Sequence, residues 1–316
     1  MTSWDYDVII VGGGPAGLTA AIYAGRARLQ TLLVERLIHG GQVMTTELVE
    51  NYPGFPEGVS GFELSDRMRQ QAERFGAQFA SAEVLGLEPG AEAHTLILED
   101  RRLTAGAVII TSGASYRKLG VPGEAEFTGK GVSYCATCDG ALYRGHTIAV
   151  VGGGDTALTD AIFLTNFAET IHLLHRRDAL RGEKVLQERV FDKERQGKIQ
   201  IHWNTVVEEV AGGAAVEGLK VRNVKTGEAA TLEVTGVFVF VGIQPNSAWL
   251  KGQVAMDDWG FIITDDAMAA NRPGVFAAGD VRHKILRQIS TAVGDGATAA
   301  FNAEHYLSQR RTGKSL

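Results

Sequence analysis

The chain has 316 residues, of which 45% are hydrophobic and 22% are charged, and its formal net charge at pH 7 is −6. This composition is typical of a globular protein and excludes a disordered or fibrous one, and the length favours two domains. The mild acidity provides no electrostatic footprint for nucleic acid or for an anionic membrane surface, so neither is expected as a partner.

The N-terminal segment MTSWDYD is acidic where a secretory signal is basic, and the longest apolar runs have only the length of strands. Neither a signal nor a membrane-spanning segment is therefore expected. The chain has two cysteines, Cys135 and Cys138, which are too few for the disulfide framework of a secreted domain. We expect a reducing compartment, the cytoplasm, and a functional role for the pair.

The first predicted strand is the apolar run DVIIV at residues 7–11, which leads into GGGPAG at 12–17, a helical stretch of small residues, and a second strand, TLLVE. Gly12, Gly14 and Gly17 fit the pattern GxGxxG. The first glycine permits a tight turn, the second lets backbone N–H groups approach a pyrophosphate, and the third lets the helix pack on the strand. One such loop is weak evidence, because glycine-rich turns without a ligand are common.

A second copy of this pattern begins at residue 147. TIAVV is followed by GGGDTA at 152–157, a helical stretch and the strand-like TIHLLH, and Gly152, Gly154 and Ala157 fit GxGxxA. Two copies in the same order of strand, turn, helix and strand predict two dinucleotide-binding units.

The two copies differ at the end of the second strand. Glu35 and His175 both lie 18 residues beyond the last small residue of their loops. Glu35 therefore lies where an acidic side chain accepts hydrogen bonds from an adenosine ribose. His175 opens the run HRRDALR, where Arg176 and Arg177 could bind a 2′-phosphate, unless they only form a solvated charged loop. The first site suits FAD and the second suits NADPH.

The cysteine pair lies in the run CATCDG, directly before the second glycine loop. The CxxC spacing can close a disulfide and lowers the pKa of one thiol. A zinc site would need two further ligands at suitable spacing, and two buried inert cysteines are the other alternative. Asp139 would raise a neighbouring thiol pKa, so it suits the transfer of a proton to and from a dithiol. We expect a redox disulfide and no metal site.

The first domain is expected to return at the C-terminus. GVFAAGD at 274–280 predicts a strand that ends in Gly-Asp, and a helix of small residues is expected from 290 to 307. Asp280 could accept hydrogen bonds from a ribityl chain or only cap the following turn. The start of the helix near Gln288 and Ile289 could face a flavin, where its dipole would stabilise an anionic reduced ring.

These patterns predict an α/β protein with two Rossmann-like domains, in which the NADPH domain is inserted into the FAD domain. The expected FAD domain is discontinuous and spans residues 1–117 and 246–316, and the expected NADPH domain spans 118–245 and carries the cysteine pair. The crossings are placed at turn-prone stretches, LGVPG at 119–123 and GIQPN at 242–246.

Taken together, these runs resemble the low-molecular-weight, bacterial-type thioredoxin reductases of the pyridine nucleotide-disulfide oxidoreductase family. The resemblance extends in the same order over essentially the whole chain and includes RQISTA, GGQ at 40–42, ENYPGF at 50–55 and TSGASYRKLGVPGE at 111–124. It implies FAD contacts from Gly12, Gly14, Pro15, Ala16, Gly17, Glu35, Gln42, Asn51, Gly113, Gly279, Asp280, Arg287, Gln288 and Ile289. It implies NADPH contacts from Gly152, Gly154, Asp155, Thr156, Ala157, His175, Arg176, Arg177 and Arg181. The family often has Asn at the position of Asp155, so the contacts of this residue are left open.

The resemblance also implies a relay in which a hydride passes from NADPH to FAD, two electrons pass to the Cys135–Cys138 disulfide, and the dithiol reduces thioredoxin. Cys138 would face the flavin, Cys135 would attack the partner, and Asp139 would act as the acid and base. Family members are homodimers, which we expect here. Two alternatives stay open: a flavin-dependent dithiol/disulfide oxidoreductase that acts on another partner, and a non-enzymatic flavin redox sensor.

Overall fold

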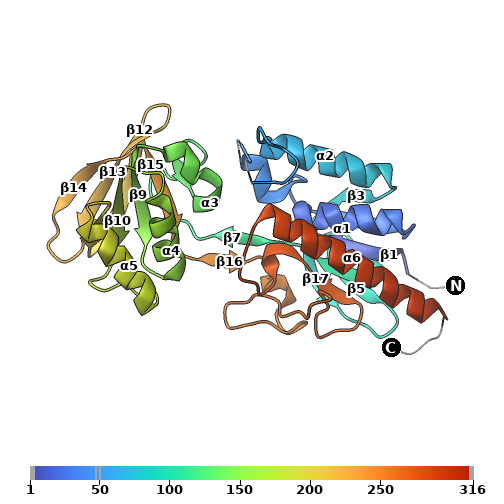
Figure 1. The fold of residues 1–316 in the computed structure, drawn as a ribbon. Coiled ribbons are helices and arrows are strands. Elements are labelled where there is room, and N and C mark those ends of the chain that lie inside the picture. Colours follow the sequence, from blue (N-terminus) through green and yellow to red (C-terminus); the bar gives the residue numbers. More distant parts are fainter. Residues whose placement is uncertain (1–3, 47, 50, 313–316) are drawn as a thin grey trace. The chain divides into compact units, whose positions relative to one another are not determined.

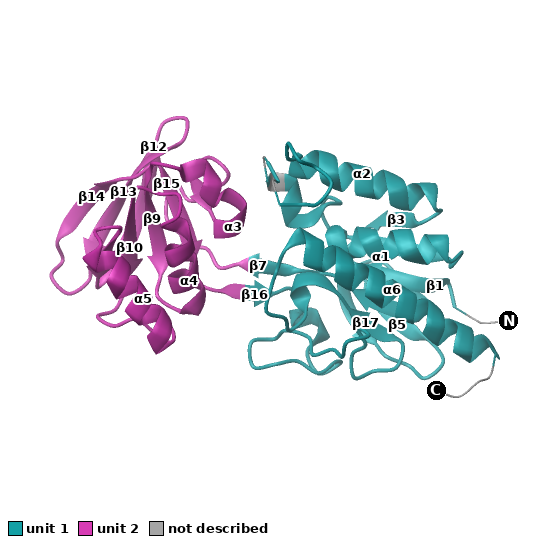
Figure 2. Cartoon of the chain, in the orientation of Figure 1, with its two compact units in different colours: residues 1–115, 244–316 teal, residues 116–243 magenta. Residues whose placement is uncertain are grey.

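The structure is a computed structural model that describes residues 4–46, 48, 49 and 51–312. The chain forms two compact units, which Figure 2 distinguishes by colour. Unit 1 comprises residues 1–115 and 244–316, and unit 2 comprises residues 116–243. Unit 1 is thus discontinuous and unit 2 is inserted into it, and both contain a mainly parallel sheet with helices. The predicted α/β class with an inserted domain is confirmed.

Unit 1 is built on a sheet with the strand order β3-β2-β1-β6-β5-β4. β1, β2, β3 and β6 are parallel, whereas β4 and β5 form an antiparallel extension at one edge. β17 pairs with residues 108–110 of β6, beyond the part of β6 that pairs with β5. The strands are β1 (Tyr6–Val11), β2 (Thr31–Glu35), β3 (Gln78–Ser81), β4 (Val84–Glu88), β5 (His94–Leu98), β6 (Arg102–Ile110) and β17 (Val275–Ala277).

Both faces of this sheet are buried, which explains why β1, β2 and β6 read as continuous apolar runs rather than alternating ones. The helices of one face and the short 3₁₀ turns of the unit are α1 (Pro15–Arg26), α2 (Gly61–Arg74), α6 (Ile289–Thr312), η1 (Gly41–Thr45), η3 (Ala248–Leu250) and η4 (Gly279–Val281). Ser60 is the N-cap of α2, because its hydroxyl accepts the Glu63 N–H at 3.1 Å.

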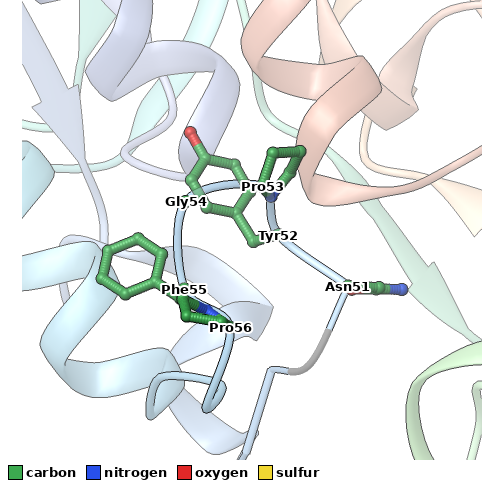
Figure 3. Close-up of a pocket in the computed structure, with 6 residues that line it drawn as sticks. All are labelled: Asn51, Tyr52, Pro53, Gly54, Phe55 and Pro56. Carbon is green, nitrogen blue, oxygen red and sulfur yellow. The ribbon is translucent and has the colours of Figure 1, made fainter.

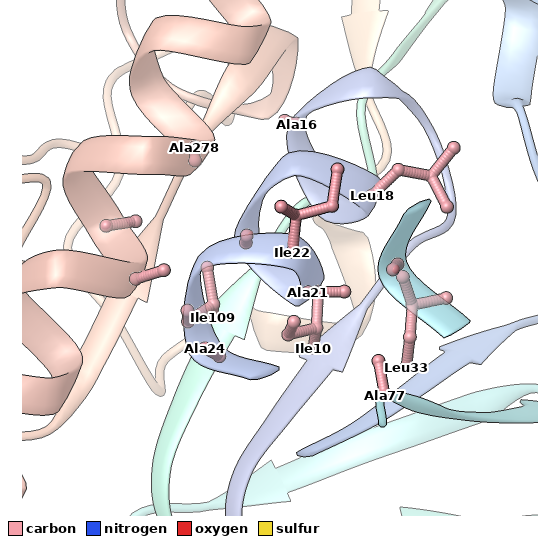
Figure 4. Close-up of a cluster of buried hydrophobic side chains, with 14 of the residues drawn as sticks. Ile10, Ala16, Leu18, Ala21, Ile22, Ala24, Leu33, Ala77, Ile109 and Ala278 are labelled. Atoms are coloured by element: carbon pink, nitrogen blue, oxygen red, sulfur yellow. The ribbon is translucent and has the colours of Figure 1, made fainter. Parts of the chain in front are cut away.

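The position of α1 is fixed by close packing. Figure 4 shows its side chains, including Leu18 and Ile22, gathered with Ile10 and Ile109 of the sheet, and α6 packs beside it. The small residues of α6 allow this approach, since a Cβ at Gly296 would lie 2.2 Å from the Ala16 carbonyl oxygen. The N-terminus of α1 is therefore held rigidly at the end of β1, where the first glycine loop lies.

Unit 2 has three layers. Its parallel sheet has the order β11-β10-β9-β15-β8, and one face packs against α4 and α5 while the other packs against an antiparallel meander, β12-β13-β14. Its strands are β8 (Val132–Ser133), β9 (Thr147–Gly152), β10 (Thr170–His175), β11 (Ile199–Trp203), β12 (Thr205–Gly212), β13 (Val216–Asn223), β14 (Ala229–Glu233) and β15 (Gly236–Phe240). Its helices and 3₁₀ turn are α3 (Ala136–Asp139), η2 (Gly140–Tyr143), α4 (Asp155–Leu164) and α5 (Lys184–Arg195).

The chain crosses between the units along two paired strands, β7 (Ala114–Tyr116) and β16 (Ile243–Pro245), which Figure 1 labels. The Arg117 N–H donates to the Gly242 carbonyl at 2.9 Å, and the Asn246 N–H donates to the Gly113 carbonyl at 3.0 Å. Backbone hydrogen bonds thus continue on both sides of the crossing.

Candidate functional site

The first glycine loop joins β1 to the N-terminus of α1. Gly12 has φ of +113°, and a Cβ there would lie 2.3 Å from the Thr111 carbonyl oxygen, so only glycine fits. A Cβ at Gly17 would lie 1.9 Å from the Gly12 carbonyl oxygen. At Gly14, by contrast, no atom lies within 4 Å of a built Cβ. The loop therefore presents open space directly before the N–H groups of α1, the arrangement that accepts a phosphate. Pro15 and Ala16 form the first turn of α1.

Glu35 ends β2 and braces this loop. Its Oε2 accepts the Gly13 N–H at 2.7 Å and its Oε1 accepts the Leu37 N–H at 2.9 Å. His39 lies beside it, and burial lowers the pKa of His39, so this ring is neutral near pH 7. Its Nδ1 is buried and has no hydrogen-bond partner among the residues that the structure describes. A carboxylate and an unsatisfied imidazole nitrogen can both bind ribose or adenine groups.

Asp280 follows β17 within η4, and its Oδ1 is buried without a hydrogen-bond partner in the described part of the chain. Burial raises the pKa of Asp280, while the positive charges of Lys284 and Arg287 oppose that shift. An unsatisfied buried carboxylate oxygen is costly unless a donor reaches it, and the hydroxyl of a ribityl chain is such a donor.

The turn that carries Asp280 is anchored by Asp295 of α6. One carboxylate oxygen of Asp295 accepts the Gly279 N–H at 3.1 Å and the Lys284 ammonium at 2.7 Å, and the other accepts Arg282 at 3.2 Å. The Lys284 and Asp295 side chains are only 9% and 13% exposed. This cluster fixes Gly279 and Asp280 at the start of the turn.

The remaining predicted flavin residues belong to several segments of unit 1. The Asn51 amide donates to the Gln288 side-chain oxygen at 3.1 Å, next to the start of α6 at Ile289. Asn51 also belongs to the wall of a pocket formed by residues 51–56, shown in Figure 3. Gln42 donates to the Ala114 carbonyl, Gly113 adjoins β7, and the Arg287 guanidinium lies 4.2 Å from the centre of the Phe261 ring. Glu50, the first residue of the run ENYPGF, lies outside the described residues.

The second glycine loop repeats the first within unit 2. No atom lies within 4 Å of a built Cβ at Gly154, which precedes α4, and Thr156 and Ala157 lie in the first turn. The Gly153 carbonyl accepts the Arg181 N–H at 2.7 Å, just as the Gly13 carbonyl accepts the Gly40 N–H at 2.7 Å. In both units the segment after the second strand is thus hydrogen-bonded to the glycine loop.

In unit 2 this segment after the second strand is the basic run HRRDALR at residues 175–181. His175 is only 4% exposed, burial lowers its pKa, and its Nε2 lies 3.0 Å from the Ala179 carbonyl oxygen. The ring fills the space beside Gly153, so His175 supports the loop from within. The side chains of Arg176, Arg177 and Arg181 are exposed.

Asp155 connects the glycine loop to the far end of the basic segment. Its Oδ1 accepts the Glu183 N–H at 2.6 Å. This hydrogen bond joins the first residue of α4 to the N-cap residue of α5.

Cys135 and Cys138 form a disulfide at the short helix α3. Asp139 follows directly, and burial raises its pKa while a hydrogen bond from Ser133 lowers it. The Ser133 hydroxyl donates to Asp139 Oδ2 at 2.6 Å, and the Cys135 N–H donates to Ser133 Oγ at 3.1 Å. A disulfide, a carboxyl group whose pKa burial raises and a buried hydroxyl thus form one connected group.

The buried carboxylate of Glu124 links the residue before Cys135 to residues 116–120, the first residues of unit 2. Glu124 is 2% exposed, and its oxygens accept the Leu119 and Gly120 N–H groups, both at 2.8 Å, and the Tyr134 hydroxyl at 2.9 Å. The Tyr134 ring stacks on Tyr116 with ring centres 5.4 Å apart. Residues 116–120 are therefore fixed to the residue before Cys135.

Sequence reasoning missed Ser133, Glu124, Asp295 and His39. Asp295 carries a sequence signal, since it is a lone charge within a helical stretch of small residues, VGDGATAA. The other residues carry none, because their partners become neighbours only through the fold.

The described part of the chain has neither a cluster of metal-binding side chains nor a helix that could span a membrane. Within residues 4–46, 48, 49 and 51–312, no three His, Cys, Asp or Glu side chains are grouped so that they could hold a metal ion. Over the same residues, no helix has the length and apolarity needed to cross a membrane.

Comparisons with known proteins agree over nearly the whole chain. Residues 6–296 match the family model of the pyridine nucleotide-disulphide oxidoreductases. The chain is 46% identical to the thioredoxin reductase of Listeria monocytogenes over 96% of this chain and 94% of the relative. It is 45% identical to that of Bacillus subtilis over 96% and 95%. The crystal structure of thioredoxin reductase from Streptococcus pyogenes matches with a TM-score of 0.92 and 45% identity, covering 96% of this chain and 98% of that one. The chain therefore belongs to the pyridine nucleotide-disulphide oxidoreductase family, in its thioredoxin reductase branch.

Proposed function

We propose that this chain is an NADPH-dependent flavoprotein that reduces the disulfide of thioredoxin through Cys135 and Cys138. The observation that carries the proposal is the Cys135–Cys138 disulfide in the same unit as a nucleotide loop with exposed arginines. The CxxC spacing suits thiol–disulfide exchange with other disulfides, a reaction that a purely structural disulfide does not perform. Thioredoxin as the partner is supported by the relatives at 46% and 45% identity.

FAD is proposed to bind unit 1. The open space at Gly14 and the N–H groups of α1 suit its pyrophosphate, and Glu35 suits the adenosine ribose. The unsatisfied Oδ1 of Asp280 suits a hydroxyl donor, and the start of α6 at Ile289 suits the flavin ring. When bound, FAD supplies the two-electron chemistry that connects a nicotinamide to a disulfide.

NADPH is proposed to bind unit 2 through the open space at Gly154 and the N–H groups of α4. The exposed Arg176, Arg177 and Arg181 would contact the 2′-phosphate, because guanidinium groups form paired hydrogen bonds with phosphate. His175 would act by supporting this segment, since its ring is buried against Gly153. Asp155 would keep the segment beside the loop through its bond to the Glu183 N–H.

The redox group is proposed to work as follows. Two electrons open the Cys135–Cys138 bond, and the two sulfurs that result take up protons. Asp139 would supply one of them, because it follows Cys138 directly and burial raises its pKa. Cys135 would then lose its proton to water and, as a thiolate, attack the partner disulfide. Cys138 would give its proton to the Asp139 carboxylate, close the bond with Cys135 again and release the reduced partner.

The test is steady-state turnover with purified, FAD-loaded protein. NADPH should be oxidised when oxidised thioredoxin is added, and Cys135→Ser or Cys138→Ser should abolish this while flavin reduction by NADPH persists. Thioredoxin turnover in either variant would refute the role of the pair. Disulfide-dependent turnover with another protein but not with thioredoxin would favour the alternative partner. Flavin reduction by NADPH without turnover on any disulfide substrate would favour a redox sensor.

Two further properties are proposed on the same family basis. The protein is expected to be a homodimer, which light scattering of the FAD-loaded protein would test. A chain with only two cysteines that must cycle between dithiol and disulfide suits a reducing compartment such as the cytoplasm.

A further inference from the structure

Ser133 is a buried hydroxyl that lies between the acid/base candidate and the backbone of the redox pair. It ends the short strand β8, is 4% exposed, and pairs with Phe238 of β15. Its Oγ lies 2.6 Å from Asp139 Oδ2, 3.1 Å from the Cys135 nitrogen and 3.3 Å from the Cys135 carbonyl oxygen. One hydroxyl thus reaches three polar groups.

A serine hydroxyl has one proton to donate and two lone pairs that accept, and its proton rotates freely. When Asp139 is ionised, Ser133 donates to Oδ2 and accepts the Cys135 N–H. When Asp139 is protonated, its O–H can donate to Ser133 Oγ, and the serine proton can turn to the Cys135 carbonyl at 3.3 Å. Every group in the set keeps a partner in both states, without movement of any heavy atom.

We propose that Ser133 is the positioning residue for Asp139, whose carboxyl group it keeps hydrogen-bonded, in both protonation states, beside the Cys135–Cys138 pair. This inference rests on the proposed function, in which Asp139 exchanges protons with the pair. When two electrons open the S–S bond, Asp139 gives one proton to a sulfur and becomes a carboxylate, and water supplies the second. When the bond closes again, the carboxylate regains a proton.

Other titratable groups near Asp139 belong to the elements that pack on α3. Tyr143 of η2 has a pKa raised to about 12, first by burial and then by the negative charge of Asp139, so it stays neutral. α4 carries Asp155, which is bonded to the Glu183 N–H, and Asp160, whose pKa burial raises to about 6. Asp160 is therefore a second carboxyl group near α3 whose pKa burial raises, and the experiment must separate its titration from that of Asp139.

The experiment compares Ser133→Ala with the wild type and measures the rate of thioredoxin reduction by the FAD-loaded enzyme from pH 5 to 9. A hydrogen bond to an ionised group contributes enough to move its pKa by about one to two units. Loss of the serine bond should raise the pKa of Asp139, so the profile should shift by about one to two pH units towards higher pH, with a maximum lowered about tenfold. The rate of flavin reduction by NADPH should not change.

Three variants serve as controls. Ser133→Thr keeps the hydroxyl and should restore the wild-type profile. Thr205→Val removes another buried hydroxyl of unit 2, which donates to the Trp203 carbonyl at 2.9 Å, and should leave the profile unchanged. Asp160→Asn should remove any titration that belongs to Asp160 and retain the shift caused by Ser133→Ala.

The outcomes separate the inference from the proposed function. If Asp139→Asn removes the pH dependence but Ser133→Ala leaves it in place, Ser133 has no positioning role and the proposed function stands. If Asp139→Asn changes nothing, Asp139 is not the acid/base, and the inference is wrong with it.

A second measurement needs no substitution at Ser133 and decides the matter if Ser133→Ala does not fold. In the oxidised wild type, the NMR signal of the Cys135 amide proton should titrate with the same midpoint as the Asp139 carboxyl carbon. A Cys135 amide that does not respond to Asp139 would overturn the proposal.

Discussion

The buried carboxylate of Glu124 should stabilise unit 2, and Glu124→Gln tests this directly. One oxygen accepts both the Leu119 N–H and the Tyr134 hydroxyl, and the other accepts the Gly120 N–H. A glutamine can keep its oxygen at the first position, but its NH₂ group then faces the Gly120 N–H, so two donors oppose each other. The variant loses one bond to a charged acceptor and weakens two more, a loss of about 2–4 kcal/mol in the free energy of unfolding.

The assay is urea unfolding monitored by amide hydrogen exchange, in which the exchange rates of residues 116–243 are analysed separately from those of unit 1. Unit 2 should unfold at lower urea in Glu124→Gln, and the Leu119 and Gly120 amides should exchange faster even without urea. The matched control is Glu126→Gln, the same substitution two positions away at an exposed side chain, which should change stability by less than about 0.5 kcal/mol. Equal unfolding of Glu124→Gln and Glu126→Gln would refute the reasoning.

Four further substitutions have defined outcomes. Arg176→Gln and Arg177→Gln should each weaken NADPH binding about 10- to 100-fold with little effect on NADH, whereas exposed Arg195→Gln should affect neither; equal loss of both nucleotides would assign the arginines another role. Gly154→Ala should fold with little loss of stability, because no atom lies within 4 Å of the new Cβ, but should bind NADPH at least tenfold less tightly in a direct titration. Asp160→Asn should stabilise unit 2 at pH 7–8 by about 1–3 kcal/mol in urea unfolding, because burial raises the pKa of Asp160 to about 6 and its ionisation in the folded state costs stability. This gain should vanish as the pH falls from 6 to 4, where Asp160 becomes protonated. A gain that persists at pH 4 would contradict this cause.

The features of the fold that depend on residues close together in the sequence could be predicted. The glycine loops could be read because their turn, phosphate-facing position and helix contact all lie within six residues of chain, at 12–17 and 152–157. The insertion of one unit into the other followed from a strand ending in Gly-Asp far from the first loop. The antiparallel strands β4 and β5 and the meander β12-β13-β14 were not predicted, because their short alternating runs carry weak signals.

The crossings between the units show what turn propensity cannot decide. The turn-prone stretch at 119–123 was expected to be the exit from unit 1, but in the structure the chain crosses at residues 115 and 116. Leu119 and Gly120 belong to unit 2, because the Glu124 carboxylate binds both of their N–H groups. A sequence shows that the chain turns at these glycines but not which unit the turn packs against.

The residues of the candidate site likewise fall into two groups: those that are neighbours in the sequence and those that become neighbours only in the fold. Cys135, Cys138 and Asp139 are close in sequence, so their association could be predicted. Ser133 and Asp139 are only six residues apart in the sequence, but their contact depends on how β8 meets α3. The contact of Asp295 with Gly279 depends on the position of α6 beside the sheet. Contact between His175 and a nucleotide stays a prediction; the structure adds that its ring is buried and lies against Gly153.

The central claim is that electrons from NADPH reach the Cys135–Cys138 disulfide, and an anaerobic titration tests it most directly. FAD-loaded protein is titrated with NADPH without any disulfide substrate, quenched in denaturant with a thiol-alkylating reagent, and mapped by mass spectrometry. The account predicts that two alkylated thiols appear per chain, at Cys135 and Cys138. A flavin that NADPH fully reduces while both cysteines stay unmodified in the disulfide would contradict it.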